Sequence, residues 1–155
     1  MFDLQRIFHT GLCVADIEAA KQQLGRDLNL EWLPVRTFDP LPFWTPEQGL
    51  GEIVVKATYS RQGPHRLELC EGPRNTLYDP DLQPDNRHIG VWVDDLPSEV
   101  EKLLSAGWSV RGASGSPEDG YGILAYMAPP MPGLVVELVA ESLRPALDEW
   151  FASAE

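Results

Sequence analysis

Two histidines and two glutamates in this sequence have the residue types of a divalent-metal site: His9, Glu68, His88 and Glu137. Imidazole nitrogens and carboxylate oxygens suit Zn, Mn, Co, Ni and Fe(II) alike. Each glutamate also stands alone in an apolar run, and a buried carboxylate without a partner is costly. Taken singly, each histidine fits a buried core position in which its hydrogen bonds are satisfied. Each glutamate, taken singly, fits a solvent-exposed face of a sheet. Taken together, the four residues predict a divalent-metal site whose metal is not identified.

The four residues occupy matching places in an internal repeat. Residues 8–16 and residues 87–95 each carry a histidine, a glycine two positions later and an aspartate seven positions later. Each copy is followed by an apolar run with one glutamate, at residues 66–70 and 134–139. Alternate side chains of a strand share a face, so each run can present its histidine or glutamate to a common side. The repeat therefore predicts that each half supplies one histidine and one glutamate.

Helix and strand signals place these residues in a repeated order of elements. Asp16 and Asp95 can cap helices that follow the first strand of each half, with Gly25 and Gly107 as stops. The remaining strands are expected near residues 30–35, 52–59 and 65–70 in the first half and 109–111, 123–127 and 133–139 in the second. Each half thus reads βαβββ. We expect an α+β fold in which two paired βαβββ modules form a cupped, mostly antiparallel sheet around a cavity.

The chain length of 155 residues fits one domain built from these two modules. Module 1 covers about residues 6–72, a polar linker residues 73–86, module 2 about residues 87–140, and a C-terminal helix residues 141–155. Apolar residues recur at helical spacing in this last segment, which predicts that it docks on the domain or on a second chain. They are Leu143, Leu147, Trp150 and Phe151.

Several aromatic residues are candidates for a substrate pocket. Phe43 and Trp44 lie in a proline-rich segment, residues 36–51, that is predicted to be a loop. The sequence leaves two roles open for them: lining the mouth of a pocket, or covering the edge of the hydrophobic core. Trp92 shares a strand face with His88, and Tyr126 lies in an expected strand of the second half. We expect these four side chains to contact the substrate. The indole of Trp92 favours an apolar or aromatic substrate.

Composition excludes several classes of partner. A formal net charge of −12 argues against nucleic acid and against an anionic membrane surface. No apolar stretch approaches the roughly 20 residues that span a bilayer, and the first residues lack an export signal, so a cytoplasmic protein is expected. Two cysteines, Cys13 and Cys70, are too few for a disulfide scaffold and fit small buried residues.

Over about residues 8–139 the chain resembles the vicinal oxygen chelate superfamily, which contains glyoxalase I, methylmalonyl-CoA epimerase, extradiol dioxygenases and bleomycin-resistance proteins. Its members are built from paired βαβββ modules, and the metal-dependent ones place a ligand on the first and last strand of each module. The resemblance implies that His9, Glu68, His88 and Glu137 are the ligands. Family members pair their modules within one chain or between two, and a homodimer is expected.

Within the superfamily, the pattern is most similar to the methylmalonyl-CoA epimerase and glyoxalase branch. Residues 47–54 resemble an epimerase stretch whose last glutamate is a candidate base, and this implies a place in the site for Glu52. The expected function is metal-dependent proton transfer at a carbon next to a carbonyl, as in an epimerase, isomerase or glyoxalase-type lyase acting on a small carbonyl compound. Glu137 and Glu52 are the candidate bases.

Two other functions remain open from the sequence. One is an iron-dependent extradiol-type dioxygenase that acts on a catechol-like ring, with Tyr126 or another tyrosine nearby. A requirement for Fe(II) and uptake of oxygen would indicate it. The other is a non-catalytic binding protein that sequesters a hydrophobic small molecule in the cup and needs no metal.

Overall fold

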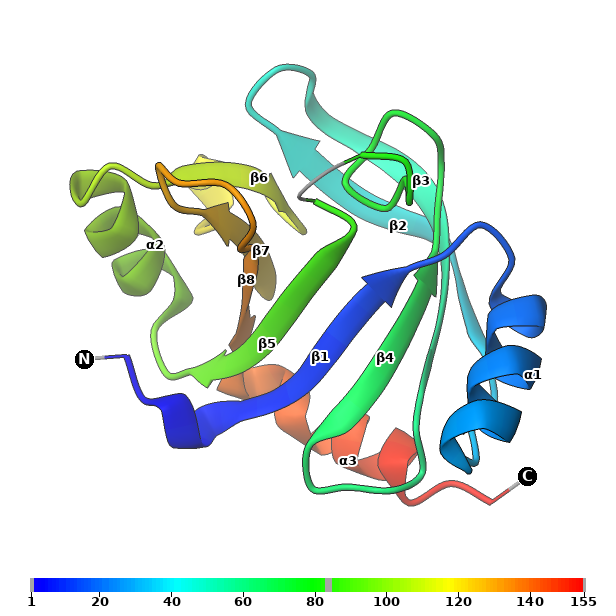
Figure 1. Cartoon of the computed structure of the whole chain (residues 1–155). Coiled ribbons are helices and arrows are strands. Elements are labelled where there is room, and N and C mark those ends of the chain that lie inside the picture. Colours follow the sequence, from blue (N-terminus) through cyan, green and yellow to red (C-terminus); the bar gives the residue numbers. More distant parts are fainter. Residues whose placement is uncertain (1, 83–84, 155) are drawn as a thin grey trace.

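The computed structural model describes residues 2–82 and 85–154, which form a closed eight-stranded barrel flanked by helices (Figure 1). The strands are β1 (Ile7–Cys13), β2 (Arg36–Thr45), β3 (Gly49–Tyr59), β4 (Arg66–Glu71), β5 (Arg87–Val93), β6 (Ser109–Ala113), β7 (Leu124–Ala128) and β8 (Val136–Ala140). The helices are α1 (Ile17–Leu28), α2 (Leu96–Ser105) and α3 (Arg144–Phe151), with short 3-10 turns η1 (Leu4–Arg6), η2 (Pro117–Asp119) and η3 (Glu141–Leu143). Within the described residues, no helix combines the length and the hydropathy needed to cross a bilayer.

The two halves of the chain repeat one topology. Around the barrel the order is β1-β4-β3-β2 for the first half and β5-β8-β7-β6 for the second. In each half the first strand runs parallel to the last, β1 beside β4 and β5 beside β8. The halves join where β1 pairs antiparallel with β5, and again through a single residue pair between β2 and β6, Trp44 with Ala113. The predicted α+β fold of two βαβββ modules is confirmed.

The aspartate caps of the two long helices are confirmed, and one predicted helix end is wrong. The Asp16 carboxylate accepts a hydrogen bond from the backbone N–H of Ala19, and Asp95 accepts the equivalent bond in α2. Helix α1, however, continues past Gly25 to Leu28 and ends at Asn29, whose φ is 55°. Asparagine adopts this left-handed conformation readily, and its N–H closes the helix on the Gly25 carbonyl, so glycine was not needed as the stop.

Two predictions for this part of the chain are wrong. The strand expected at residues 30–35 lies instead at β2, in the segment 36–51 that was expected to be a loop. It spans Arg36–Thr45 despite containing Pro40 and Pro42, and it pairs with β3 along most of its length. Proline lacks a backbone N–H and is therefore confined to strand edges. The other side of β2 is such an edge, because it pairs with β6 only at Trp44. The proline-rich segment is thus a strand whose outer side is almost free of partners.

The polar segment expected as a linker also contributes to the core. Tyr78 is 2% exposed and packs over Gly72, where a Cβ atom would lie 2.6 Å from the Cβ of Tyr78. Leu77 is buried in the same cluster. The expected linker, residues 73–86, therefore covers part of the barrel interior; its residues 83–84 lie outside the described residues.

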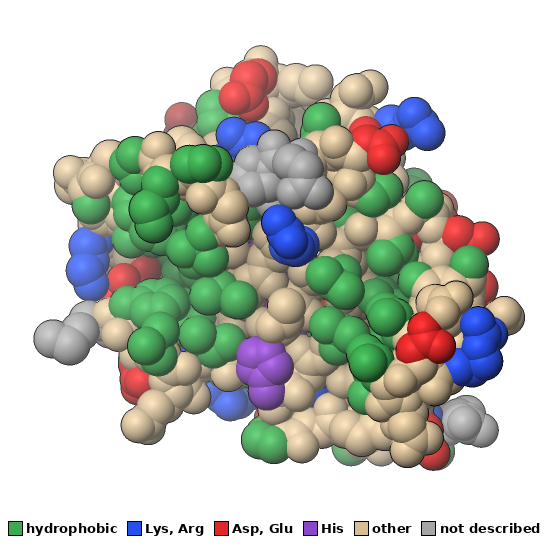
Figure 2. Space-filling model, in the orientation of Figure 1, with side chains coloured by type: hydrophobic (Ala, Val, Ile, Leu, Met, Phe, Trp, Pro, Cys, Tyr) green, Lys and Arg blue, Asp and Glu red, His purple; other side chains and the backbone are tan. Residues whose placement is uncertain are grey.

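Helix α3 docks on the domain itself. It lies below the barrel in Figure 1, while α1 and α2 flank the barrel on opposite sides. Leu147 and Trp150 of α3 are buried, and the Trp150 indole N–H donates a hydrogen bond to the Pro34 carbonyl at 3.1 Å. The surface facing the viewer in Figure 2 shows acidic and basic side chains scattered singly among apolar groups.

Candidate metal centre

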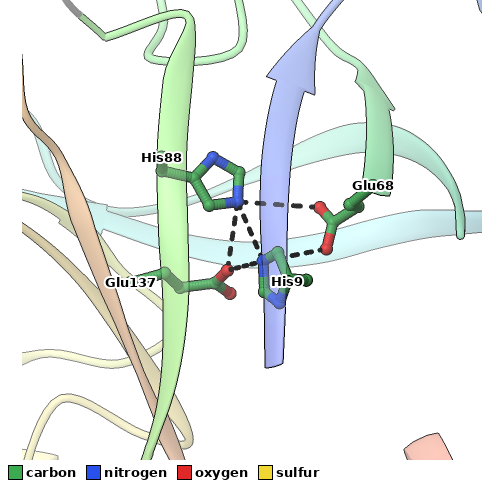
Figure 3. Close-up of side chains that lie close together, drawn as sticks. All are labelled: His9, Glu68, His88 and Glu137. Atoms are coloured by element: carbon green, nitrogen blue, oxygen red, sulfur yellow. Dashed lines mark hydrogen bonds and ion pairs between the residues drawn. The ribbon is translucent and has the colours of Figure 1, made fainter. Parts of the chain in front are cut away.

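Four neighbouring strands of the barrel each contribute one side chain to a buried cluster (Figure 3). In the order β4, β1, β5 and β8, these are Glu68, His9, His88 and Glu137. All four are buried, with between 0% and 5% of their surface exposed. The parallel pairing of β1 with β4 and of β5 with β8 brings the last strand of each half beside the first. The repeat in the sequence therefore places all four candidate ligands around one site within a single chain.

The four side chains converge on one point. The Nε2 atoms of His9 and His88 lie 3.2 Å apart, and Oε2 of Glu137 lies 3.0 Å from the first and 3.2 Å from the second. Glu68 approaches from the opposite side, with Oε2 at 3.3 Å from His9 Nε2 and Oε1 at 3.8 Å from His88 Nε2. One ligand atom from each residue fits within 4.8 Å of all the others.

This spacing fits a small divalent cation. An ion about 2.0–2.2 Å from each nitrogen or oxygen ligand holds neighbouring ligand atoms about 3 to 3.5 Å apart in tetrahedral or octahedral geometry. Two neutral imidazoles and two carboxylates would also carry two buried negative charges, which a divalent ion neutralises. The Oε2 atom of Glu137 supports this fit, because it is buried and lacks a hydrogen bond although both Nε2 atoms are near. The predicted ligand set therefore suits a metal.

The electrostatics of the cluster couple the carboxylates to the imidazoles. Burial lowers the pKa of His9, but the negative charges of Glu68 and Glu137 outweigh it, so that the pKa is raised. Burial raises the pKa of Glu137, yet its contacts with His88 and His9 lower that pKa to about 2. Without a metal, the cluster therefore favours an ionised Glu137 beside a protonated imidazole. A divalent ion would take the place of that proton.

Packing orients the two imidazole rings. The Nδ1 atoms of both histidines are buried and lack a hydrogen-bond partner among the described residues. The His9 ring instead contacts the Phe8 and Tyr59 rings edge-on, with centroids 4.5 and 5.6 Å away, and the His88 ring contacts Tyr126 at 5.2 Å. These aromatic neighbours turn the Nε2 atoms toward each other. Tyr126 was predicted from the sequence as a pocket residue, but the role of Phe8 and Tyr59 in orienting His9 was missed.

A cavity of about 230 Å³ opens beside the cluster. Its polar lining consists of the two glutamate ligands, Arg36, Cys70 and three phenols, and the remaining lining residues are apolar. The phenols are Tyr59, Tyr78 and Tyr126, and burial raises the pKa of each well above its usual value. All three therefore stay protonated and can donate hydrogen bonds. Cys70 is the nearest of these groups to a ligand, since its thiol donates to Oε1 of Glu68.

The structure distributes the predicted pocket residues over several places. Tyr126 lines the cavity. Trp92 stacks on Phe8 with ring centroids 4.1 Å apart, and the lining of the cavity, as described, does not include it. Phe43 packs against Tyr78 and borders a different hollow, and Trp44 contacts Tyr121. The structure thus brings one of these four residues to the cavity beside the ligands.

Glu52 lies apart from the four ligands. It is exposed on β3, where the following residues Ile53 and Val55 pack in the interior cluster. It borders a different, more polar hollow with Glu47 and Arg111. Side chains alternate along a strand, so Glu52 points outward with Lys56. The structure does not bring this candidate base to the cluster.

Comparison with known proteins supports the arrangement of the modules. Residues 8–126 match the model of the glyoxalase/bleomycin resistance protein/dioxygenase superfamily. The chain belongs to this superfamily. The match contains His9, Glu68 and His88, whereas Glu137 and helix α3 lie beyond it. A comparison with proteins of curated function found no match.

Solved structures share the fold of this superfamily member. Methylmalonyl-CoA epimerase from Mycobacterium tuberculosis has a TM-score of 0.54 and 16% identity, covering 95% of this chain and 97% of that one. The hypothetical protein BH1468 from Bacillus halodurans has a TM-score of 0.53 and 18% identity, covering 87% and 93%. A Streptomyces coelicolor methylmalonyl-CoA epimerase in complex with 2-nitronate-propionyl-CoA has a TM-score of 0.52 and 17% identity, covering 87% and 96%. At these identities the likeness concerns the fold.

Proposed function

We propose that this protein is a divalent-metal-dependent enzyme that moves a proton at a carbon next to a carbonyl group. The observation that carries the proposal is the convergence of four buried metal-type ligands beside a mostly apolar cavity. The names of the epimerases that share the fold support this class of reaction. Epimerases, isomerases and lyases that act at such a carbon share this proton transfer.

The site residues have distinct tasks in such a reaction. A bound divalent ion supplies Lewis-acid stabilisation of the negative charge that develops on the carbonyl oxygen. Both histidines and Glu68 are proposed to hold the ion. Glu137 presents only Oε2 to the two histidines in the contacts described, and its side chain lines the cavity. Its other oxygen is therefore our candidate to accept and return the substrate proton.

Glu137 is preferred to Glu52 as the base on grounds of position. A general base must come within hydrogen-bond reach of the proton that it removes. Glu137 lines the cavity beside the ligands, while Glu52 is exposed on the outer side of β3. The phenols of Tyr59 and Tyr126 line the same cavity and can donate hydrogen bonds to a substrate oxygen.

Proton exchange tests the proposal directly. Protein stripped with EDTA and reloaded with Zn, Co, Ni, Mn or anaerobic Fe(II) would be incubated in D2O with a panel of small ketones and aldehydes. NMR should show deuterium entering the carbon next to the carbonyl only with metal-loaded protein. Replacing Glu137 with Gln should abolish exchange and leave the circular dichroism spectrum unchanged. An active variant would remove Glu137 from the mechanism.

The same samples separate the two rival functions. Oxygen uptake with a catechol and Fe(II), without proton exchange, would favour a dioxygenase. Tight binding of an apolar compound that is unchanged by EDTA would favour a binding protein. Metal-dependent exchange with neither of these results supports the proposed function.

A further inference from the structure

Helix α3 forms one wall of the cavity beside the candidate metal centre. Ala146, Leu147 and Trp150 of α3 line that cavity, and Leu143 extends the same wall into the preceding turn η3. The polar atom of the Trp150 side chain is turned away, because its N–H donates to the Pro34 carbonyl. The wall that α3 presents is therefore apolar.

From this wall we infer the substrate class: a small, uncharged carbonyl compound whose alkyl or aryl group packs against α3. The inference rests on the proposed function, because the metal centre must hold the oxygen end of the same molecule. Helix α3 lies outside the residues that match the superfamily model.

The opposite wall of the cavity is also apolar. The barrel contributes Phe8, Val55, Leu124 and Val139, which are buried or partly buried in the same hydrophobic cluster as Leu147 and Trp150. The polar lining groups include the glutamate ligands and the phenols, and the Tyr59 ring also contacts the Trp150 ring edge-on, with centroids 5.1 Å apart. A molecule that binds the metal through oxygen would therefore place its remaining atoms among apolar side chains.

Charge around the cavity disfavours an anionic substrate. Among the described lining residues, Arg36 is the one basic side chain, and its guanidinium lies 4.5 Å above the Trp150 ring instead of beside the ligands. The two glutamate ligands are the acidic groups. A carboxylate or phosphate deep in this cavity would meet a mostly apolar lining with two glutamates and a single basic side chain, which is costly for an anion.

Size limits the substrate further. The cavity of about 230 Å³ is smaller than the roughly 300–1,000 Å³ typical of pockets for drug-sized ligands. This space suits a carbonyl compound with one short alkyl chain or one aromatic ring.

The wall is held in place by several contacts. Arg144, the first residue of α3, donates two hydrogen bonds to Glu141, each at 2.7 Å, and Arg6 pairs with the same carboxylate. At the other end, the Arg61 guanidinium donates to the Ser153 carbonyl at 2.9 Å. These contacts hold both ends of α3 against the barrel. Because the helix is held in place, its side chains can discriminate between substrates by size and polarity.

Hydroxamic acids provide the test, because two oxygens of a hydroxamate bind a metal whatever group is attached to it. Titration calorimetry of the Zn-loaded protein would compare acetohydroxamate, benzohydroxamate and the monohydroxamate of succinic acid. Benzohydroxamate should bind at least tenfold more tightly than acetohydroxamate, since its ring buries apolar surface. The succinate compound should bind more weakly than acetohydroxamate because of its carboxylate.

Two variants locate the effect at α3. Leu147→Asn, and Leu143→Asn at the less buried edge of the wall, should each reduce the preference for benzohydroxamate over acetohydroxamate at least threefold. Leu50→Asn is the matched control, because Leu50 is 57% exposed on β3 and does not line the cavity as described. The Leu143 variant keeps the test informative if the Leu147 variant does not fold.

The outcomes separate this inference from the proposed function. If the Zn-loaded protein binds acetohydroxamate and benzohydroxamate equally, or prefers the succinate compound, the inferred substrate class is wrong while an open metal site stands. If no hydroxamate binds, or no Zn is taken up, the metal-dependent function itself fails. A preference for benzohydroxamate that depends on Leu147 or Leu143 supports both.

Discussion

The imidazole of His9 lies directly over Gly90 of the neighbouring strand. A Cβ atom built on Gly90 would lie 1.9 Å from Cε1 of the His9 ring, a distance at which no side chain fits. The relationship is reciprocal, since a Cβ on Gly11 would lie 2.1 Å from Cε1 of His88. The antiparallel register of β1 and β5 places each histidine opposite the glycine of the other module. Each His-x-Gly motif therefore makes room for the histidine of the other half.

Replacing Gly90 with Ala should displace the His9 ring and weaken metal binding. The added methyl group overlaps the ring, and overpacking of a core costs about 1–3 kcal/mol in typical proteins. We expect at least a tenfold loss in Zn affinity by titration calorimetry, together with a lower midpoint of thermal unfolding. Gly51→Ala on β3 is the control, because a Cβ atom on Gly51 would lie 3.9 Å from the Phe43 carbonyl oxygen, an ordinary van der Waals contact. Unchanged Zn affinity in Gly90→Ala would show that the His9 ring is not a ligand.

Binding of a metal should stabilise the folded protein, and this effect should depend on His88. A ligand that binds only the folded state at 100 times its dissociation constant adds about 2.7 kcal/mol to the free energy of unfolding. Urea unfolding with Zn and with EDTA should therefore differ in the wild type. In His88→Ala the difference should disappear. His65→Ala is the matched control, since His65 is exposed and contacts Thr10. Equal metal stabilisation in the His88 variant would place the ion elsewhere.

The internal repeat explains how much of the site could be predicted from the sequence. His9, Glu68, His88 and Glu137 could be chosen because each half carries the same His-x-Gly motif and a lone glutamate in an apolar run. Their convergence needs only the parallel pairing of first and last strands within each module. The sequence also indicated the Asp16 and Asp95 caps, which are local contacts between residues three apart.

The predictions that differed from the structure depended on contacts between distant residues. Proline content argued against a strand at residues 36–45, but whether a proline is tolerated depends on the neighbouring strand, which chain order does not reveal. Strand parity put Trp92 on the face of His88, yet its stacking on Phe8 and the Arg144 guanidinium above its ring were not predictable. The resemblance to an epimerase stretch that suggested Glu52 spans only a few residues. It does not indicate which face of β3 these residues occupy.

The ion-pair network at Glu141 should make stability depend on acid pH. Hydrogen bonds from Arg144, and then from Arg6, lower the pKa of Glu141 from 4.5 to about 2. A carboxylate whose pKa is depressed in the folded state stabilises the fold above its unfolded pKa, and loses this effect as pH falls through the folded value. Glu141→Gln should thus lower the free energy of unfolding at pH 7. The difference from wild type should shrink between about pH 4.5 and pH 2 in urea titrations. A difference independent of pH would rule out the charge as its source.

The Tyr78 and Tyr126 hydroxyls should show strong energetic coupling. They lie 3.0 Å apart in the barrel interior, and each is the described hydrogen-bond partner of the other. Replacing either tyrosine with phenylalanine leaves a buried hydroxyl without its partner, at a cost of about 1–3 kcal/mol, whereas replacing both removes donor and acceptor together. The double variant should therefore lose less stability than the sum of the single variants. A double-mutant cycle from urea unfolding would measure this coupling. Additive losses would mean that each hydroxyl has another partner and that the pair does not act as a unit at the cavity wall.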